Sequence, residues 1–295
     1  MVASLNSTPE IDSERSTEAE LRSAEQVRTP APARSGILSR LRSYLVFDPL
    51  IWIYTVVLGI ISIPFGLFDR NGRILHGFAR FWSQLIMKTI CSPVKVTGLE
   101  KIDISKPHVY AVNHASALDI PVLYVYLPFQ FRIVFKKELL SYPVIGWHLK
   151  RSGQICIDQQ KPAASIGSIR AALKSLKAGM PLVIFPEGGR TPDGEIKPFL
   201  AGAFFLAIKA QVDIVPIALV GTYELLRMNT YHIKCRPLEM RVGAPIPTAG
   251  LMLRDMDALS IKVKTAMEAL YYEGHPAAQT LGSERLGRVG APAPM

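Results

Sequence analysis

Residues 108–119, HVYAVNHASALD, contain a short apolar run, a polar turn and the beginning of a second apolar segment. The run 108–112 is typical of a buried strand, and residues 117–126 are long enough for a helix. The same change occurs at 181–194, where PLVIF is followed by PEGGRTPDG. Both stretches therefore predict a strand that ends at a turn carrying polar and charged side chains.

Further strands and helices are predicted on both sides of these two stretches. The predicted strands are 94–98, 108–112, 131–136, 154–158, 181–185 and 213–220, with a further one at 238–243. The predicted helices are 117–126, 163–177, 202–210 and 254–272. Alternation of this kind is typical of an α/β domain, here residues 93–273, with a mixed sheet flanked by helices.

Charge and cysteine content exclude several classes of protein. The 34 Lys and Arg residues exceed the 24 Asp and Glu residues and give a net charge of +10, which suits anionic lipid, polyphosphate or nucleic acid. Nucleic acid is disfavoured because the sequence has neither a basic helix nor strands with interleaved aromatic and basic residues. Three widely spaced cysteines outside any C-x-x-C pattern indicate neither a disulfide framework nor a zinc site, and fit a cytosolic compartment.

The segment before the α/β domain is predicted to associate with a membrane. Residues 1–36 and 274–295 have the composition of disordered tails. Residues 49–68 carry no charge, and twenty helical residues reach about 30 Å, the thickness of a hydrocarbon core. Basic residues on both sides favour a membrane-embedded helical hairpin within 37–92, the alternative being a buried core helix.

The stretch 73–90 predicts an amphipathic helix. Its apolar residues recur at steps of three and four, and Arg73, Arg80 and Lys88 lie elsewhere around the turn. Such a helix can lie at an anionic membrane interface or pack on a globular core. Periodicity alone leaves both possibilities open.

His114 and Asp119 form the first candidate site. Two side chains five residues apart on a helix point about 140° apart, so these two converge only if His114 lies in the turn before the helix. Ser116 and Asp119 resemble a capping box, which places the helix start near Ser116. A histidine held by a carboxylate can act as a general base, although a capped helix with an incidental histidine fits the same spacing.

The turn at 186–194 forms the second candidate site. A glycine-rich turn after a strand can direct backbone N–H groups at an anion, and Arg190 offers a planar guanidinium for a phosphate. The turn lacks the G-x-x-x-x-G-K-[ST] pattern of a nucleotide-binding loop. The alternative is an ordinary loop closed by a surface Glu–Arg pair.

Four ordered blocks between about residues 85 and 225 resemble the glycerolipid acyltransferases of the 1-acylglycerol-3-phosphate acyltransferase type. They are NHASALD (113–119), KKELLSYPVIGWHLKRSGQICID (136–158), FPEGGR (185–190) and VPIALVGT (215–222). The resemblance implies that His114 is the general base and Asp119 its partner. It implies substrate binding by residues of the second and third blocks: Lys137, Glu187, Gly188, Gly189 and Arg190. Two positions depart from the family's pattern, Gln159 where Arg is common and Gly189 where Thr is usual.

The resemblance also implies an activity. A fatty acyl group would pass from acyl-CoA or acyl carrier protein to the free sn-2 hydroxyl of 1-acylglycerol 3-phosphate, giving phosphatidic acid. No cofactor beyond the acyl donor and no metal is expected, and the partners would be the lipid acceptor, the donor and an anionic membrane surface, with no nucleic acid. The expected location is a membrane, with the catalytic domain on the cytoplasmic side of a bacterial inner membrane. The alternatives are an acyltransferase for another lysolipid or an amino-acid lipid, and a non-catalytic lipid-binding membrane protein.

Overall fold

The computed structural model describes residues 36–158 and 166–273. The chain divides after Leu41 into two compact units, and the larger of them begins at Arg42. The predicted tails lie outside the described residues, apart from Gly36, as do positions 159 and 163–165.

The chain alternates strands and helices from residue 94 onward, as predicted. The helices are α2 (Ile37–Arg42), α3 (Asp48–Phe68), α4 (Arg73–Ile90), α5 (Asp119–Tyr126), α6 (Pro143–Arg151), α7 (Ile166–Lys177), α8 (Gly202–Ala210), α9 (Thr222–Leu225) and α10 (Met256–Tyr272), with a π-helical turn at Ser43–Phe47. The strands are β1 (Val94–Thr97), β2 (Val109–Val112), β3 (Arg132–Lys136), β4 (Ile155–Ile157), β5 (Leu182–Ile184), β6 (Ile214–Val220) and β7 (Leu238–Val242). The helix α6 was not predicted, although Pro143 stands at its first turn, where proline fits a helix.

The seven strands form one mixed sheet in the order β1-β7-β6-β2-β5-β3-β4. All neighbouring pairs are parallel except β6 and β7, which are antiparallel. The strand β2 lies in the middle, between β6 and β5, and all four of its residues are buried. The prediction of a mixed α/β sheet is confirmed.

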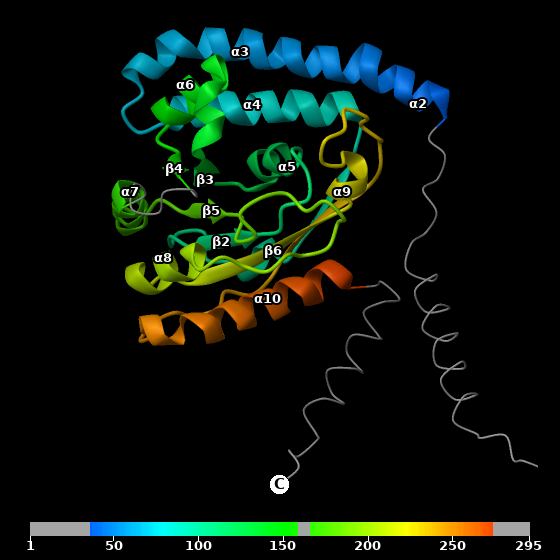
Figure 1. The fold of residues 1–295 in the computed structure, drawn as a ribbon. Helices are drawn as coiled ribbons and strands as arrows, with labels where there is room; N and C mark the ends of the chain where they lie inside the picture. Colours follow the sequence, from blue (N-terminus) through cyan, green and yellow to red (C-terminus); the bar gives the residue numbers. More distant parts are fainter. Residues whose placement is uncertain (1–35, 159–165, 274–295) are drawn as a thin grey trace, which may run out of the picture. The chain divides into compact units, whose positions relative to one another are not determined.

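Helices cover both faces of the sheet, so the core has two parts (Figure 1). Alternate residues of β2 contribute to each part: Tyr110 and Val112 face the side with α4 and α5, and Val109 and Ala111 face the side with α7, α8 and α10. This alternation follows from the pleat of a strand, in which successive side chains point to opposite faces. A central strand buried on both faces therefore has the continuous apolar sequence that the run 108–112 shows.

The helices α3 and α4 run side by side and are joined by the turn 69–72 (Figure 1). Trp82 Nε1 donates to Thr55 Oγ1 at 2.9 Å, which ties the two helices together. Asp69 accepts the N–H groups of Arg73 at 3.0 Å and Leu75 at 2.8 Å and so caps the start of α4. The apolar run 49–68 lies in one helix that packs on α4, and a membrane-embedded hairpin stays a prediction.

The helix α4 packs on the α/β core along one face, which settles the question that its periodicity left open. Ile86, Met87 and Ile90 are buried in the core beside α5. Arg80 does not extend into solvent as the polar-face interpretation implies, because its guanidinium donates to the carbonyls of Val125 at 3.1 Å and Leu127 at 3.3 Å. The part of the segment 37–92 that can meet lipid is therefore mainly the outer face of α3.

That outer face is apolar and exposed. Within the described residues, one helical run, Ile37–Phe68, is long and apolar enough to cross a membrane, and 11% of its most apolar window is buried. A core helix of a soluble protein would be mostly buried.

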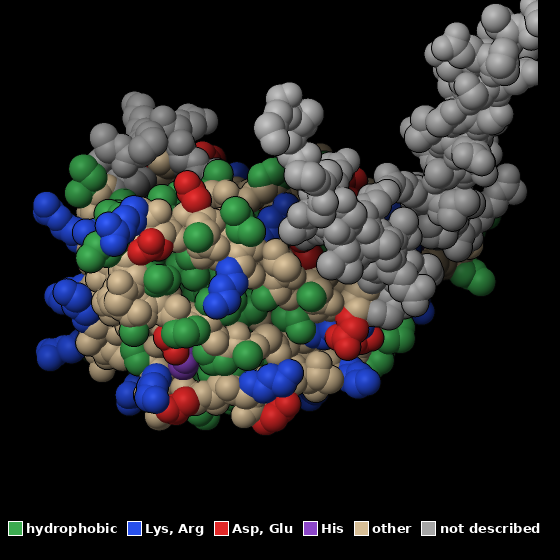
Figure 2. Space-filling view, turned by 90° about the horizontal axis from the view of Figure 1, so that it is seen from below, with side chains coloured by type: hydrophobic (Ala, Val, Ile, Leu, Met, Phe, Trp, Pro, Cys, Tyr) green, Lys and Arg blue, Asp and Glu red, His purple; other side chains and the backbone are tan. Residues whose placement is uncertain are grey.

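On the opposite side of the molecule, seen in Figure 2, Lys and Arg side chains are spread among acidic and apolar ones rather than gathered in one patch.

Candidate active site

The two predicted site segments meet at one edge of the sheet. His114 follows the carboxyl end of β2 and Glu187 follows the carboxyl end of β5, and these strands are parallel neighbours. The segments are hydrogen-bonded to each other, because His114 N–H donates to Glu187 Oε1 at 2.7 Å and Thr191 N–H donates to the His114 carbonyl at 2.8 Å. Carboxyl ends of parallel strands are the usual position of ligand sites in α/β sheets.

His114 and Asp119 lie together, with His114 in the turn and Asp119 as the first residue of α5. His114 Nδ1 is 2.8 Å from Asp119 Oδ2, and the same oxygen accepts the N–H groups of Ala115 and Ser116, each at 2.8 Å. The side chain of Asp119 is fully buried. The predicted capping box is present only in part. Asp119 Oδ2 accepts the N–H of Ser116, but Ser116 Oγ accepts the N–H of Leu118, at 3.2 Å, instead of that of Asp119.

This contact fixes the tautomer of the imidazole. Asp119 Oδ2 already accepts two backbone N–H groups, so it can only accept from His114, and Nδ1 must carry the proton. Nε2 then has a free lone pair, and no hydrogen bond joins it to any described residue. The His114 side chain is 18% exposed and stacks on the ring of Phe185 at a centroid distance of 4.0 Å. An imidazole held in this way can accept a proton at Nε2.

Glu187 connects the two turns through backbone N–H groups and does not bind an anion directly, because its carboxylate is itself an acceptor. Its Oε1 accepts the His114 N–H and its Oε2 accepts the Lys197 N–H at 3.0 Å. Burial raises the pKa of the Glu187 carboxyl, and the two N–H groups oppose that rise. Glu187 therefore fixes the backbone of His114 relative to that of Lys197.

The glycine turn is surrounded by basic side chains. Gly188 has a φ of 69°, which glycine adopts without strain, and the carbonyl of half-buried Arg190 accepts from Lys197 Nζ at 3.2 Å. A Cβ atom placed on Gly189 would lie 3.2 Å from Lys136 Nζ and 3.9 Å from Lys197 Nζ. Two ammonium groups therefore flank the position at which the family's pattern has Thr.

One predicted substrate-binding residue, Lys137, has an acidic partner within the protein. Lys137 begins an exposed 3₁₀ turn, and its ammonium pairs with Asp158 at 3.2 Å. Its neighbour Lys136, the last residue of β3, is the lysine at the glycine turn. Adjacent residues at a strand end point in different directions, so a choice between two consecutive lysines requires the register of the sheet.

Sequence reasoning also left out two residues that hold the site in place. Asn113 Oδ1 accepts the Leu219 N–H at 2.7 Å and its Nδ2 donates to the Leu219 carbonyl at 3.1 Å, which extends the contact between β2 and β6 past the strand end. Phe185 supports the imidazole through the stacking of the two rings. Asn113 belongs to the block NHASALD and Phe185 to the block FPEGGR, so the sequence showed their positions but not their roles.

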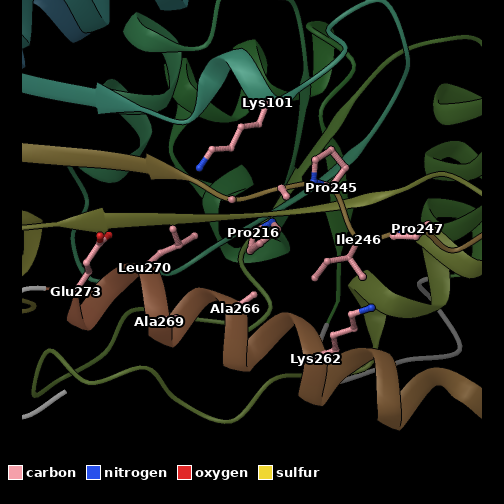
Figure 3. Close-up of a pocket in the computed structure, with 12 residues that line it drawn as sticks. Lys101, Pro216, Pro245, Ile246, Pro247, Lys262, Ala266, Ala269, Leu270 and Glu273 are labelled. Atoms are coloured by element: carbon pink, nitrogen blue, oxygen red, sulfur yellow. The ribbon is translucent and has the colours of Figure 1, made fainter. Parts of the chain in front are cut away.

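A cavity of about 570 Å³ lies elsewhere, between α10 and the segment after β7 (Figure 3). Its walls include Pro216, Pro245, Ile246 and Leu270, with Lys101 and Lys262 at its rim, and none of the predicted site residues lines it. Among the described residues, no group of three or more His, Cys, Asp or Glu side chains could hold a metal ion.

Comparison with known proteins shows what this chain is similar to. The model described as Acyltransferase matches residues 93–220. The chain is 34% identical over 177 residues to the chloroplastic 1-acyl-sn-glycerol-3-phosphate acyltransferase BAT2 of Brassica napus, which covers 59% of this chain and 51% of that protein. It is 32% identical over 181 residues to 1-acyl-sn-glycerol-3-phosphate acyltransferase alpha of Homo sapiens, covering 61% of this chain and 64% of that one.

A solved structure shows the same fold. The crystal structure of the 1-acyl-sn-glycerophosphate (LPA) acyltransferase PlsC from Thermotoga maritima superposes with a TM-score of 0.66 at 21% identity and covers 79% of this chain and 95% of that one. The chain spans about half the length of the plant relatives that it matches. Residues 93–220 thus match the Acyltransferase model, and the relatives that the chain matches at 30–34% identity are named 1-acyl-sn-glycerol-3-phosphate acyltransferases.

Proposed function

We propose that the protein is a 1-acylglycerol-3-phosphate O-acyltransferase, which moves a fatty acyl group from a thioester donor to the sn-2 hydroxyl of 1-acylglycerol 3-phosphate and gives phosphatidic acid. The observation that carries the proposal is the buried contact of Asp119 with His114 Nδ1, which leaves Nε2 free beside a turn flanked by cations. The names of the relatives support the same acceptor.

In this mechanism His114 acts as a general base. Its Nε2 takes the proton of the acceptor hydroxyl while the hydroxyl oxygen forms a bond to the thioester carbonyl carbon. Asp119 stabilises the imidazolium that results. When the tetrahedral intermediate collapses, the carbon–sulfur bond breaks, and the leaving thiolate takes the proton from the imidazolium. The acyl group passes directly to the acceptor, and no acyl-enzyme is needed.

Basic side chains at the glycine turn would hold the acceptor by its phosphate. Arg190 offers a planar guanidinium and Lys136 an ammonium, and the backbone of Gly188 and Gly189 lets an anion approach closely. Backbone N–H groups of the same turn would stabilise the oxyanion of the tetrahedral intermediate. Glu187 would keep this turn at a fixed position relative to the base.

The exposed face of α3 would bring the enzyme to its acceptor. A lysolipid resides in a bilayer, and transferring its chain to water would cost about 0.8 kcal/mol for each CH₂ group. An enzyme anchored in the same leaflet avoids that cost, while the donor, acyl-CoA or acyl carrier protein, arrives from the aqueous side. We place the catalytic domain on the cytoplasmic face of a bacterial inner membrane.

The test is acyl transfer by the purified protein with lysophosphatidic acid, lysophosphatidylglycerol and lysophosphatidylcholine as acceptors. We expect preference for lysophosphatidic acid and a loss of about 100-fold or more in the His114→Ala variant, with membrane association retained. Preference for a zwitterionic acceptor would contradict the phosphate-monoester assignment. Unchanged transfer by His114→Ala would remove the proposed base, and absence of transfer by the wild type to any acceptor would favour a lipid-binding protein.

A further inference from the structure

The residue Lys197 lies at the glycine turn, although none of the sequence blocks contains it. Its ammonium and that of Lys136 approach the same point, the position of a Cβ on Gly189, from two different elements. Lys136 comes from the end of β3, and Lys197 comes from the loop that follows the turn. Two like charges near one point repel each other unless an anion lies between them.

In the described part of the chain, acidic side chains do not close an ion pair at this point, although the charges of Glu187 and Asp193 act on Lys197 at longer range. Within the described residues, no Asp or Glu forms an ion pair with Lys136, Arg190 or Lys197. Lys197 is half-buried, its ammonium donates to the Arg190 carbonyl at 3.2 Å, and an ammonium has three N–H donors. Its remaining donors and its charge are available to a ligand.

The backbone of Lys197 is tied to the proposed base. Its N–H donates to Glu187 Oε2 at 3.0 Å, and Glu187 Oε1 accepts the His114 N–H at 2.7 Å. One buried carboxylate thus links the residue that would activate the hydroxyl to the residue that carries the ammonium. An acceptor held at both points would have a defined distance between its hydroxyl and its charged group.

The loop that carries Lys197 is also held from outside the region matched by the family model. Tyr271 Oη in α10 donates to the Gly194 carbonyl at 2.9 Å, and Tyr272 Oη in the same helix donates to the Glu195 carboxylate. Tyr223 Oη donates to the Pro192 carbonyl at 2.9 Å. Three hydroxyl groups therefore restrain the loop between Thr191 and Lys197, so its lysine is presented from a fixed backbone.

We propose that Lys197 is a specificity-determining residue of the acceptor site, whose ammonium binds the phosphomonoester group of the lysolipid together with Lys136. A phosphomonoester carries between one and two negative charges at neutral pH, whereas a phosphodiester carries one. A second ammonium therefore favours the monoester. This inference rests on the proposed function and adds to it the group that distinguishes the two acceptor classes.

The experiment uses the full-length protein and measures KM and kcat for lysophosphatidic acid and lysophosphatidylglycerol with the same acyl chain. Lys197→Met keeps most of the apolar stem and the backbone N–H but removes the charge. We expect its KM for lysophosphatidic acid to rise about tenfold, with kcat within threefold of the wild type and KM for lysophosphatidylglycerol little changed. Lys197→Arg should restore most of the affinity for lysophosphatidic acid, and Lys209→Met, an exposed lysine of α8, is the matched control.

A KM for lysophosphatidic acid within twofold of the wild type in Lys197→Met would overturn the inference. An equal rise of KM for both acceptors, not reversed by Lys197→Arg, would also overturn it, because it would indicate a purely structural role. If Lys197→Met lowers the melting temperature, Lys197→Gln replaces it in the test, and its KM values for the two acceptors are judged in the same way. If the wild-type protein transfers acyl groups to none of the acceptors, the proposed function itself is contradicted. This result is seen with the wild type alone, before any variant is measured.

Discussion

His114 Nδ1 and Asp119 Oδ2 are 2.8 Å apart, and the carboxylate oxygen that contacts the ring is the one that accepts two N–H groups of the intervening turn. The orientation of the imidazole and the conformation of the turn 114–119 therefore depend on one atom. An amide in place of the carboxylate offers at most one acceptor oxygen and has no charge to stabilise an imidazolium.

We expect Asp119→Asn to lower kcat by about 10²- to 10⁴-fold, because the ring loses the partner that fixes its tautomer. The KM for the acceptor should change little, since the side chain of Asp119 is fully buried and contacts the ring of His114. Steady-state kinetics check this, with Asp257→Asn, an exposed residue of α10, as the control. A kcat within threefold of the wild type would show that Asp119 has no part in the chemistry.

The two consecutive lysines at the end of β3 should differ in effect. Lys136→Met removes an ammonium next to Gly189, and we expect KM for lysophosphatidic acid to rise about tenfold. Lys137→Met removes only an exposed pair with Asp158, so KM should stay within twofold. The reverse ranking in the same kinetic assay would contradict the register of β3, which directs Lys136 and not Lys137 to the glycine turn.

The outer face of α3 should determine membrane binding. Ile53, Val57 and Ile60 lie on one face of the helix and are 53%, 47% and 54% exposed. Replacing each by Asp should lower sedimentation with anionic vesicles at least tenfold, because a carboxylate is costly to bury in lipid. Ile261→Asp, at a 67% exposed position of α10, is the control and should bind as the wild type does. Full vesicle binding by the triple variant would mean that α3 is not the anchor.

Stability should fall with acidification through His76, a buried histidine of α4. Burial lowers the pKa of His76 to about 4 from its ordinary value of 6.5, and the charges of Arg132 and Arg80 add to the effect. The unfolded chain binds the proton first as pH falls. The contribution of His76 to the free energy of unfolding is therefore complete above pH 6.5. It is lost progressively between about pH 6.5 and pH 4, at up to about 1.4 kcal/mol per pH unit.

The variant His76→Leu should remove part of this pH dependence. Neither ring nitrogen of His76 has a hydrogen-bond partner among the described residues, so the substitution sacrifices no hydrogen bond at pH 7. His148, whose pKa burial also lowers, stays in both proteins. Urea unfolding at pH 7, 6 and 5 checks the difference, and parallel pH profiles for the two proteins would contradict it.

The packing of α3 on α6 depends on Gly59. A Cβ at this position would lie 2.0 Å from Val144 Cγ1, so Gly59→Ala requires the valine to move and should lower stability by about 1–3 kcal/mol. In a Val144→Ala background the space is free, and the same substitution should become stabilising through the higher helix propensity of alanine. Thermal unfolding of the wild type, the two single variants and the double variant measures the coupling between Gly59 and Val144. The same change in both backgrounds would mean that the two residues do not touch.

The succession of strands and helices after residue 93 was predictable because apolar runs bounded by glycine and proline identify buried strands without knowledge of their neighbours. The helix α6 was missed because it has only nine residues and begins with a proline, which is equally typical of a turn. The burial of α4 stayed open because an amphipathic helix has the same periodicity on a protein core as on a membrane.

The sequence by itself determined that His114 lies in a turn before a helix, predicted to start near Ser116, and that a glycine-rich turn with Arg190 follows a buried strand. The structure starts this helix at Asp119. Only the tertiary structure decided that these turns touch, because strand order in a sheet depends on contacts between residues far apart in the chain: Glu187 bonds to His114 across 73 positions. The choice of Lys136 over Lys137 and the approach of Lys197 to Gly189 were decided in the same way. The direction of Lys136 depends on the pleat and the register of its strand, and that of Lys197 on contacts of its loop with distant residues, and neither can be derived from residue type or spacing alone.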